Sequence, residues 1–158
     1  MIDPTSVFLP RLAAAAIVTL AMAGCSAGGG APLSPGLSAR MDQPGASLNQ
    51  VEALGIVNAY RTTSGTAALA ADTGLDSSAQ ALAAAYAKSG TAPKMPDGAV
   101  AMRVSAGYAT FAETFSGWRN SPDDAQVLSS RAATRAGLGV AYNSGSTYGV
   151  YWVLILED

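Results

Sequence analysis

The stretch from Tyr148 to Leu156 is apolar on both faces of any β-strand that it forms. A second β-rich run, from Gly137 to Tyr142, precedes it across the turn-forming residues 143–146, and the two runs predict a hairpin. Alternate side chains of a strand point to opposite sides, so one face carries Val150, Trp152, Leu154 and Leu156, and the other carries Tyr151, Val153 and Ile155. Such a strand needs cover on both faces, and the sequence therefore predicts helices on each side of a sheet.

Helix-forming patterns occupy most of the chain before the hairpin. Cap residues and apolar spacing predict four helices. The first runs from Leu48 to Arg61 and begins at the capping pair Ser47 and Gln50, and the second runs from Asp72 to Ser89 and ends at Gly90. The third begins at the capping pair Thr110 and Glu113, and a short fourth helix begins at Ser121 and Pro122. A weak alternation from Ala99 to Ser105 predicts a further strand. Together these elements predict an α/β fold, a three-layer α-β-α sandwich with a small antiparallel sheet.

The N-terminal segment carries the pattern of an export signal. An apolar run from Leu12 to Met22 follows Arg11 and is too short to span a bilayer as a helix. The residues from Leu20 to Cys25 resemble a lipobox, in which the cysteine receives diacylglycerol. We predict a lipoprotein signal peptide over residues 1–24, lipidation of Cys25, a flexible Gly/Pro/Ser-rich tether over residues 25–46 and one domain over residues 47–158.

The residue after the cysteine indicates where such a lipoprotein would reside. Ser26, rather than aspartate, follows Cys25, which is typical of lipoproteins of the outer membrane. The predicted location is the cell envelope, with the protein lipid-anchored in the outer membrane and facing the periplasm. The alternative is an ordinary signal peptide that leaves Cys25 as a free thiol.

The residue types that the sequence lacks exclude several kinds of chemistry. It contains no histidine, which is the usual general base and metal ligand near neutral pH. Its single cysteine cannot form an intramolecular disulfide. Nine Lys and Arg stand against eleven Asp and Glu, without the basic cluster that nucleic acid requires. The sequence predicts no cofactor, no metal site and no nucleic-acid partner.

Short motifs recur along the domain at characteristic intervals. The first group is Val57-Asn58-Ala59-Tyr60-Arg61 with Gly65, Leu69, Asp72 and Leu75, and the second comprises residues 111–122, 134–142 and 151–153. In order and spacing, from about Leu48 to Leu156, they resemble the CAP superfamily in its compact bacterial form. This superfamily, of SCP-like domains, is named for cysteine-rich secretory proteins, antigen 5 and pathogenesis-related proteins. The resemblance implies an α-β-α sandwich, in agreement with the hydrophobic pattern.

The sequence departs from the family pattern at the open cleft, where two histidines and acidic residues are able to hold a divalent metal. Asp124 stands at the histidine position of the family's Ser-Pro-x-His-Arg motif, and the loop from Thr91 to Ala99 lacks the second histidine. Met102 and Arg103 correspond to the Glu-Asn pair of that cleft. The resemblance thus implies a degenerate cleft at Met102, Arg103 and Asp124, with Glu113 and Asp124 as a residual polar site.

The acidic candidates also have a structural interpretation. Asp123 and Asp124 could form a carboxylate pair for acid–base catalysis or for Ca²⁺. Both follow a helix start, however, where the helix dipole favours aspartate. Glu113 has the capping-box position, and Asp72 the cap position, of their helices. The capping interpretation is therefore preferred for all four residues.

The basic and aromatic candidates are interpreted in the same way. Isolated arginines such as Arg61, Arg119 and Arg135 could bind an anion, but they more commonly bridge carbonyls or carboxylates between layers. The aromatic stripe of Phe111, Phe115 and Trp118, taken together, could line a lipid groove, but core packing is the commoner role.

We therefore expect an envelope-anchored lipoprotein whose degenerate CAP domain is a non-catalytic binding or interaction module. Its expected partners are the membrane, through the N-terminal lipid, and an envelope protein, a glycan or a lipid. Two alternatives remain open. A lipid or sterol carrier predicts a sizeable apolar groove beside the sheet, and a hydrolase predicts that Glu113 acts together with Asp124.

Overall fold

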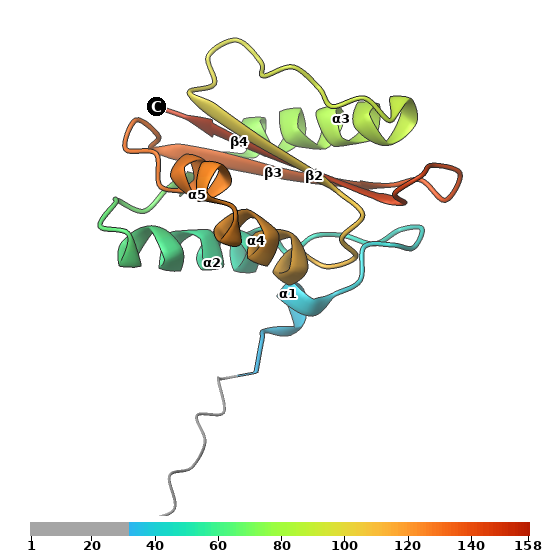
Figure 1. Ribbon diagram of the computed structural model, residues 1–158, viewed down its shortest axis with the longest axis horizontal. Helices are drawn as coiled ribbons and strands as arrows, with labels where there is room; N and C mark the ends of the chain where they lie inside the picture. The colour runs from blue at the N-terminus through green and yellow to red at the C-terminus, as the bar shows by residue number, and fades with distance from the viewer. Residues whose placement is uncertain (1–31) are drawn as a thin grey trace, which may run out of the picture. The chain divides into compact units, whose positions relative to one another are not determined.

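A sheet of four strands lies between two helical layers in the described part of the chain (Figure 1). This computed structural model describes residues 32–158, so the predicted signal peptide and Cys25 lie outside the described residues. In chain order the elements are α1 (Pro35–Ser38), α2 (Gln50–Thr63), β1 (Ala70–Ala71), α3 (Thr73–Ser89), β2 (Ala101–Ala106), α4 (Phe111–Asn120), α5 (Pro122–Leu128), β3 (Arg135–Tyr142) and β4 (Val150–Glu157). The predicted α-β-α sandwich is confirmed.

The strand order in the sheet is β1-β3-β4-β2. β4 pairs antiparallel with β3 on one side and with β2 on the other, so the predicted hairpin and the predicted third strand are both present. The two-residue strand β1 pairs parallel with β3. The sheet is therefore mixed rather than purely antiparallel as expected, because two alanines carry no alternation from which a strand could be predicted.

β4 is buried on both faces, as its sequence predicts. Trp152, Leu154 and Leu156 belong to the core that includes α2 and α4, whereas Val153 and Ile155 pack against α3. All five side chains are 0% exposed. Figure 1 shows α3 on one side of the sheet and α2, α4 and α5 on the other. The two-sided apolar pattern of this strand is thus the origin of the three layers.

The caps of α3 and α4 are those that the sequence predicts. A carboxylate oxygen of Asp72 accepts hydrogen bonds from the amides of Gly74 and Leu75 at 2.8 and 3.0 Å. Thr110 and Glu113 form a reciprocal capping box at the start of α4. Each cap satisfies backbone amides that have no partner within the helix.

The cap of α2 differs from the prediction. Asn49, rather than Ser47, caps this helix, and its Oδ1 accepts a hydrogen bond from the amide of Glu52 at 3.2 Å. Gln50 becomes the first helical residue, and its side chain is used outside the helix, as described below. At the start of α5, Ser121 is the N-cap residue but makes no side-chain capping bond. Ser47, Asn49 and Gln50 all have side chains that can take part in capping, so the local sequence before α2 does not decide which residue is the N-cap.

The folded domain begins earlier than the sequence predicts. Leu37 in α1 is 7% exposed and Met41 is 2% exposed, and both belong to the main core. The amide of Met41 donates to the carbonyl of Ala109 at 2.7 Å. The prediction of a flexible tether over residues 25–46 is therefore wrong for the stretch from Pro35 to Ala46, because its apolar side chains are buried in, or packed against, the core of the domain.

Small residues let α3 approach β3 closely. A Cβ atom on Gly137 would lie 2.1 Å from the carbonyl carbon of Leu75, and one on Gly139 would lie 2.3 Å from that of Ala79. Ala79 and Ala83 are fully buried on the facing side of the helix. The backbone of α3 therefore rests directly on the backbone of β3.

Candidate functional site

Two of the three predicted cleft positions meet in space. Arg103 lies in β2 and Asp124 in α5, and Nε of Arg103 is 2.8 Å from Oδ1 of Asp124, an ion pair without the directional geometry of a hydrogen bond. Nη2 of Arg103 donates to the backbone carbonyl of Asp123 at 3.2 Å. The two side chains are 29% and 27% exposed. A half-buried ion pair thus joins the sheet to α5 at this position.

The third predicted position, Met102, lies on the opposite side of the sheet. Neighbouring residues of a strand point to opposite faces, and Met102 packs with Val153 and Ile155 against α3. The predicted grouping of Met102 with Arg103 and Asp124 is therefore wrong, because only Arg103 and Asp124 share a face.

Glu113 and Asp124 have separate partners. The Glu113 carboxylate accepts hydrogen bonds from the amides of Ala109 and Thr110, both at 3.0 Å, and so completes the capping box of α4. Asp124 is paired with Arg103 instead. The contacts of these two carboxylates do not join them into one acid–base pair.

The donor set around Asp124 does not fit a divalent metal ion. A hard cation needs several oxygen ligands around one point, whereas the guanidinium of Arg103 brings a permanent positive charge to this carboxylate. Within residues 32–158, no group of three or more His, Cys, Asp or Glu side chains is arranged to hold a metal ion.

Arg135 links two layers of the domain. Its guanidinium contacts Asp72 at the start of α3 at 2.8 Å and Glu157 at the end of β4 at 3.0 Å. The hydrogen bond from the amide of Leu75, together with the one from Arg135, holds the pKa of Asp72 below its usual range. The expectation that this arginine bridges carboxylates is confirmed.

The aromatic stripe of α4 belongs to the core, as expected. Phe111, Phe115 and Trp118 are at most 4% exposed, and the guanidinium of Arg119 lies 6.0 Å from the ring centre of Phe115. A hollow of about 230 Å³ between α2 and α4 includes Tyr60 and Phe115 in its lining. It is smaller than the roughly 300–1,000 Å³ of typical ligand pockets, so this region offers little room for a sterol or an acyl chain.

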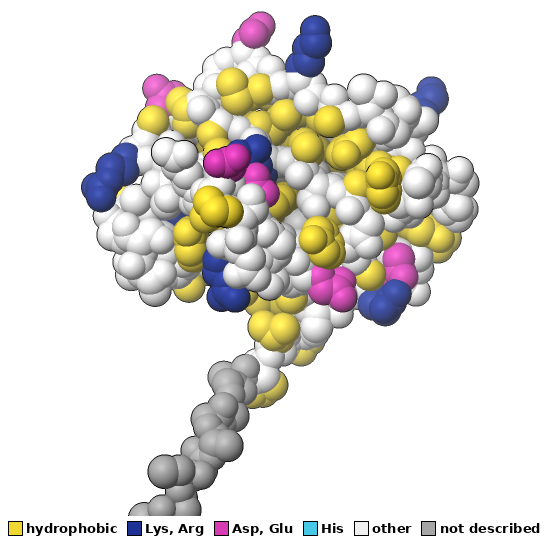
Figure 2. Space-filling view, in the orientation of Figure 1, with side chains coloured by type: hydrophobic (Ala, Val, Ile, Leu, Met, Phe, Trp, Pro, Cys, Tyr) yellow, Lys and Arg dark blue, Asp and Glu magenta, His cyan; other side chains and the backbone are white. Residues whose placement is uncertain are grey.

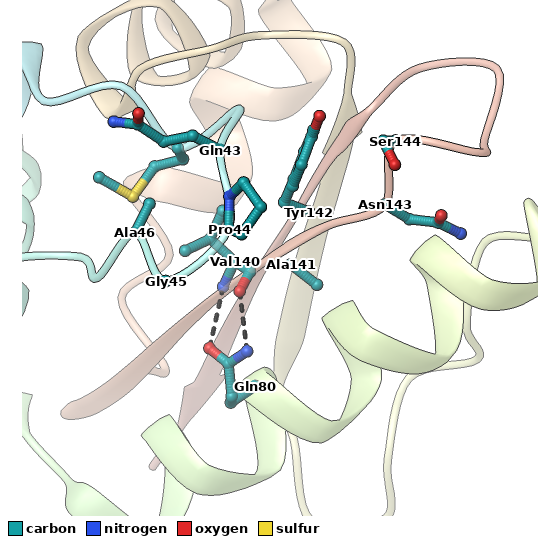
Figure 3. Close-up of a pocket in the computed structure, with 11 residues that line it drawn as sticks. Gln43, Pro44, Gly45, Ala46, Gln80, Val140, Ala141, Tyr142, Asn143 and Ser144 are labelled. Carbon is teal, nitrogen blue, oxygen red and sulfur yellow. Dashed lines mark hydrogen bonds between the residues drawn. The ribbon is translucent and has the colours of Figure 1, made fainter.

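Side chains from α2 and α3 close the outer edge of β3, which β1 covers only at its first two residues. At Leu138, Asp76 accepts a hydrogen bond from the backbone amide at 2.9 Å, and Gln50 donates to the carbonyl at 2.8 Å. At Val140, the side-chain amide of Gln80 makes both bonds, at 3.3 and 2.8 Å (Figure 3). Since an unpaired edge attracts other strands, these three side chains protect the edge from pairing.

A hollow of about 490 Å³ opens where the protected edge ends (Figure 3). We call it the edge pocket, and it is lined by Met41, residues 43–46, Gln80 and residues 140–144. All of its lining residues are uncharged. None of them was predicted as a binding residue, because they come from three segments that lie far apart in the chain, and the one motif among them, residues 134–142, was interpreted only as a mark of the family.

The face of the described residues that Figure 2 shows has no strongly charged patch. Acidic and basic side chains are scattered over the face shown in Figure 2, with no large area of one sign. Among residues 32–158, no helix has both the length and the apolar character needed to cross a membrane.

Comparison of the sequence with models of protein families identifies the family of this chain. The model of the cysteine-rich secretory protein family, CAP, matches residues 54–156, more than half of the chain. The chain belongs to the CAP family. The matched segment begins within α2 and ends within β4, and the resemblance inferred from the motifs is confirmed.

Solved structures share the fold of this CAP domain. The crystal structure of MpPR-1i is 19% identical, with a TM-score of 0.57 over 68% of this chain and 85% of that one. An outer surface protein from Borrelia burgdorferi is 14% identical, with a TM-score of 0.55 over 66% of this chain and 89% of that one. An extracellular protein containing a SCP domain from Bacillus anthracis str. Ames is 15% identical, with a TM-score of 0.58 over 70% of this chain and 40% of that one. No curated protein sequence matches this chain.

Motif residues of this CAP domain maintain the fold. Arg61 donates hydrogen bonds to backbone carbonyls, Asp72 caps α3, and the indole nitrogen of Trp152 donates to the carbonyl of Tyr108 at 2.9 Å. These three motif residues, Arg61, Asp72 and Trp152, therefore stabilise the fold through hydrogen bonds with the backbone. The departures at Arg103 and Asp124 fall on the residues of the candidate site.

Proposed function

We propose that this protein is a lipid-anchored binding module of the cell envelope and that its CAP domain performs no catalysis. The observation that carries the proposal is the ion pair between Arg103 and Asp124. The resemblance places metal ligands of the family at or beside these two positions, whereas here a cation of the protein itself occupies the space next to the carboxylate.

The chemistry of arginine explains why Arg103 beside Asp124 disfavours a bound metal ion. A guanidinium stays protonated at any physiological pH and offers donors but no acceptor. It therefore repels a metal ion and satisfies the carboxylate that would otherwise coordinate one. An envelope location is supported by the lipobox-like sequence at Cys25, and outer surface and extracellular proteins are found among the chains that share the fold.

Zinc titration tests the non-catalytic part of the proposal. By calorimetry, we expect the wild-type protein to bind no Zn²⁺ with micromolar affinity. Arg103→Glu is the matched comparison, because it removes the cation and sets a second carboxylate beside Asp124, so its zinc affinity is expected to exceed that of the wild type. One Zn²⁺ bound per wild-type chain at micromolar affinity would contradict the proposal.

Replacement of Cys25 tests the anchor. In cells fed with labelled palmitate, Cys25→Ala is expected to lose the label and to leave the membrane fraction, since each buried acyl methylene contributes about 0.8 kcal/mol to membrane binding. The neighbouring Ser26→Ala variant should keep both the label and the membrane association. Label retained by Cys25→Ala, at the level of the wild type, would show that the lipid is attached elsewhere.

A further inference from the structure

We propose that the edge pocket binds an uncharged carbohydrate; this inference rests on the proposed binding function and names the chemical class of its ligand. The pocket lies between the loop that carries Gln43 and Pro44 and the end of β3 with its following turn. Figure 3 shows Tyr142 rising between that loop and the turn that carries Ser144.

The lining favours a ligand without charge. All of the residues around the pocket are neutral, so a charged ligand would lose hydration without gaining an opposite charge. Gln43 and Ser144 are exposed, and within residues 32–158 no hydrogen bond engages their side chains or the hydroxyl of Tyr142. These groups can both donate and accept hydrogen bonds, which suits the hydroxyl groups of a sugar.

The shape of the pocket favours a compact ligand over an added β-strand. A peptide that joined the edge of β3 would need the backbone groups of Leu138 and Val140, and those are already bonded to Asp76, Gln50 and Gln80. Only the last three residues of the strand, Val140 to Tyr142, line the pocket. Its volume of about 490 Å³ lies within the roughly 300–1,000 Å³ range of small-molecule sites, and the Tyr142 ring can pack against the apolar face of a sugar.

The wall of the pocket formed by β3 and its following turn is held in place without a ligand. Gln80 fixes the backbone of Val140 with two hydrogen bonds. Asn143 fixes the turn, because its side chain donates to the carbonyl of Ala87 at 2.7 Å and accepts from the amide of Gly145 at 3.0 Å. A preformed site loses little conformational entropy on binding, which favours recognition of a small neutral ligand.

Nuclear magnetic resonance titration tests the proposal on the full-length protein, held in a detergent without a sugar headgroup. The probes are maltotriose and chitotriose as neutral saccharides, trigalacturonate as an anionic one and tetra-alanine as an extended peptide. We expect a neutral saccharide to shift the amide signals of Gly45, Tyr142 and Ser144 in a saturable manner. Gln43→Ala and Ser144→Ala should each weaken binding about three- to tenfold, the loss of one hydrogen bond.

Gln126→Ala is the matched control, since Gln126 is exposed in α5 and lines a different hollow, and its affinity should equal that of the wild type. Shifts caused by tetra-alanine alone, or by trigalacturonate alone, would overturn the ligand class and leave the binding function standing. The absence of shifts with every probe, or an equal loss in Gln126→Ala, would overturn the carbohydrate proposal itself. The zinc and palmitate results do not depend on any of these outcomes.

Discussion

Replacing Arg61 with methionine is expected to lower the free energy of unfolding of the domain by about 3–5 kcal/mol. The Arg61 side chain is 0% exposed, and burial lowers its pKa. Its guanidinium donates to the carbonyls of Ala67, Leu128, Ser130 and Ala133 at 2.7, 2.9, 2.9 and 3.3 Å.

The size of this effect follows from what the substitution leaves behind. Methionine fills much of the volume but donates no hydrogen bond, so the carbonyls around it lose their partner, at a cost of about 1–3 kcal/mol for each group that water cannot reach. These carbonyls belong to the loop after α2, the end of α5 and the segment before β3. The side chain of Arg61 therefore binds all three of these segments to α2 through hydrogen bonds to their backbone carbonyls.

Urea denaturation followed by circular dichroism measures the Arg61 effect. Arg119→Met is the matched control, because Arg119 is exposed and lies over the ring of Phe115; its change should stay within about 1 kcal/mol. Arg61→Lys should fall between the two, since an ammonium lacks the planar fork of donors. An Arg61→Met protein within about 1 kcal/mol of the wild type would show that water replaces the guanidinium.

Gly139→Ala is expected to destabilise the domain by about 3 kcal/mol or more. The added Cβ would lie 2.3 Å from the carbonyl carbon of Ala79 and 2.4 Å from its oxygen. Backbone atoms cannot turn aside as a flexible side chain can. To make room, α3 must lift from β3, and the bonds between Gln80 and Val140 that hold this strand to the helix would lengthen.

A second glycine provides the control for Gly139. Gly55 lies within α2, and a Cβ there would meet no atom within 4 Å. Gly55→Ala should therefore raise stability by about 0.5–1 kcal/mol through helix propensity. Thermal unfolding of both variants gives the comparison, with opposite shifts of Tm expected. A Gly139→Ala protein that unfolds at the wild-type temperature would mean that α3 can move away from the sheet at little cost.

Local patterns predict much of the fold. The alternation of β4, with apolar residues on both faces, requires cover on both sides and so predicts three layers. Asp72 and the pair Thr110 and Glu113 predict the starts of α3 and α4 because a cap acts on amides only two or three residues away. Where several cap residues are adjacent, as before α2, the local pattern cannot choose between Ser47 and Asn49.

The candidate site is predicted less completely. The motif comparison points to Arg103 and Asp124, and the structure brings both together. It also points to Met102, which the alternation of β2 turns to the other face. The sequence does not predict the edge pocket, since its walls come from three segments, residues 41–46, Gln80 and residues 140–144, that meet only after folding.

The order of the longer helices and strands, the two-sided burial of the last strand and the absence of histidine are properties of the sequence alone, because periodicity, capping and residue type act locally or need no structure at all. The tertiary structure decided the rest: that residues 35–46 join the core, that Arg103 neutralises Asp124, and that Gln50, Asp76 and Gln80 close the edge of β3 beside a neutral pocket. Each of these depends on the distance between segments remote in sequence, which is set only when the layers pack.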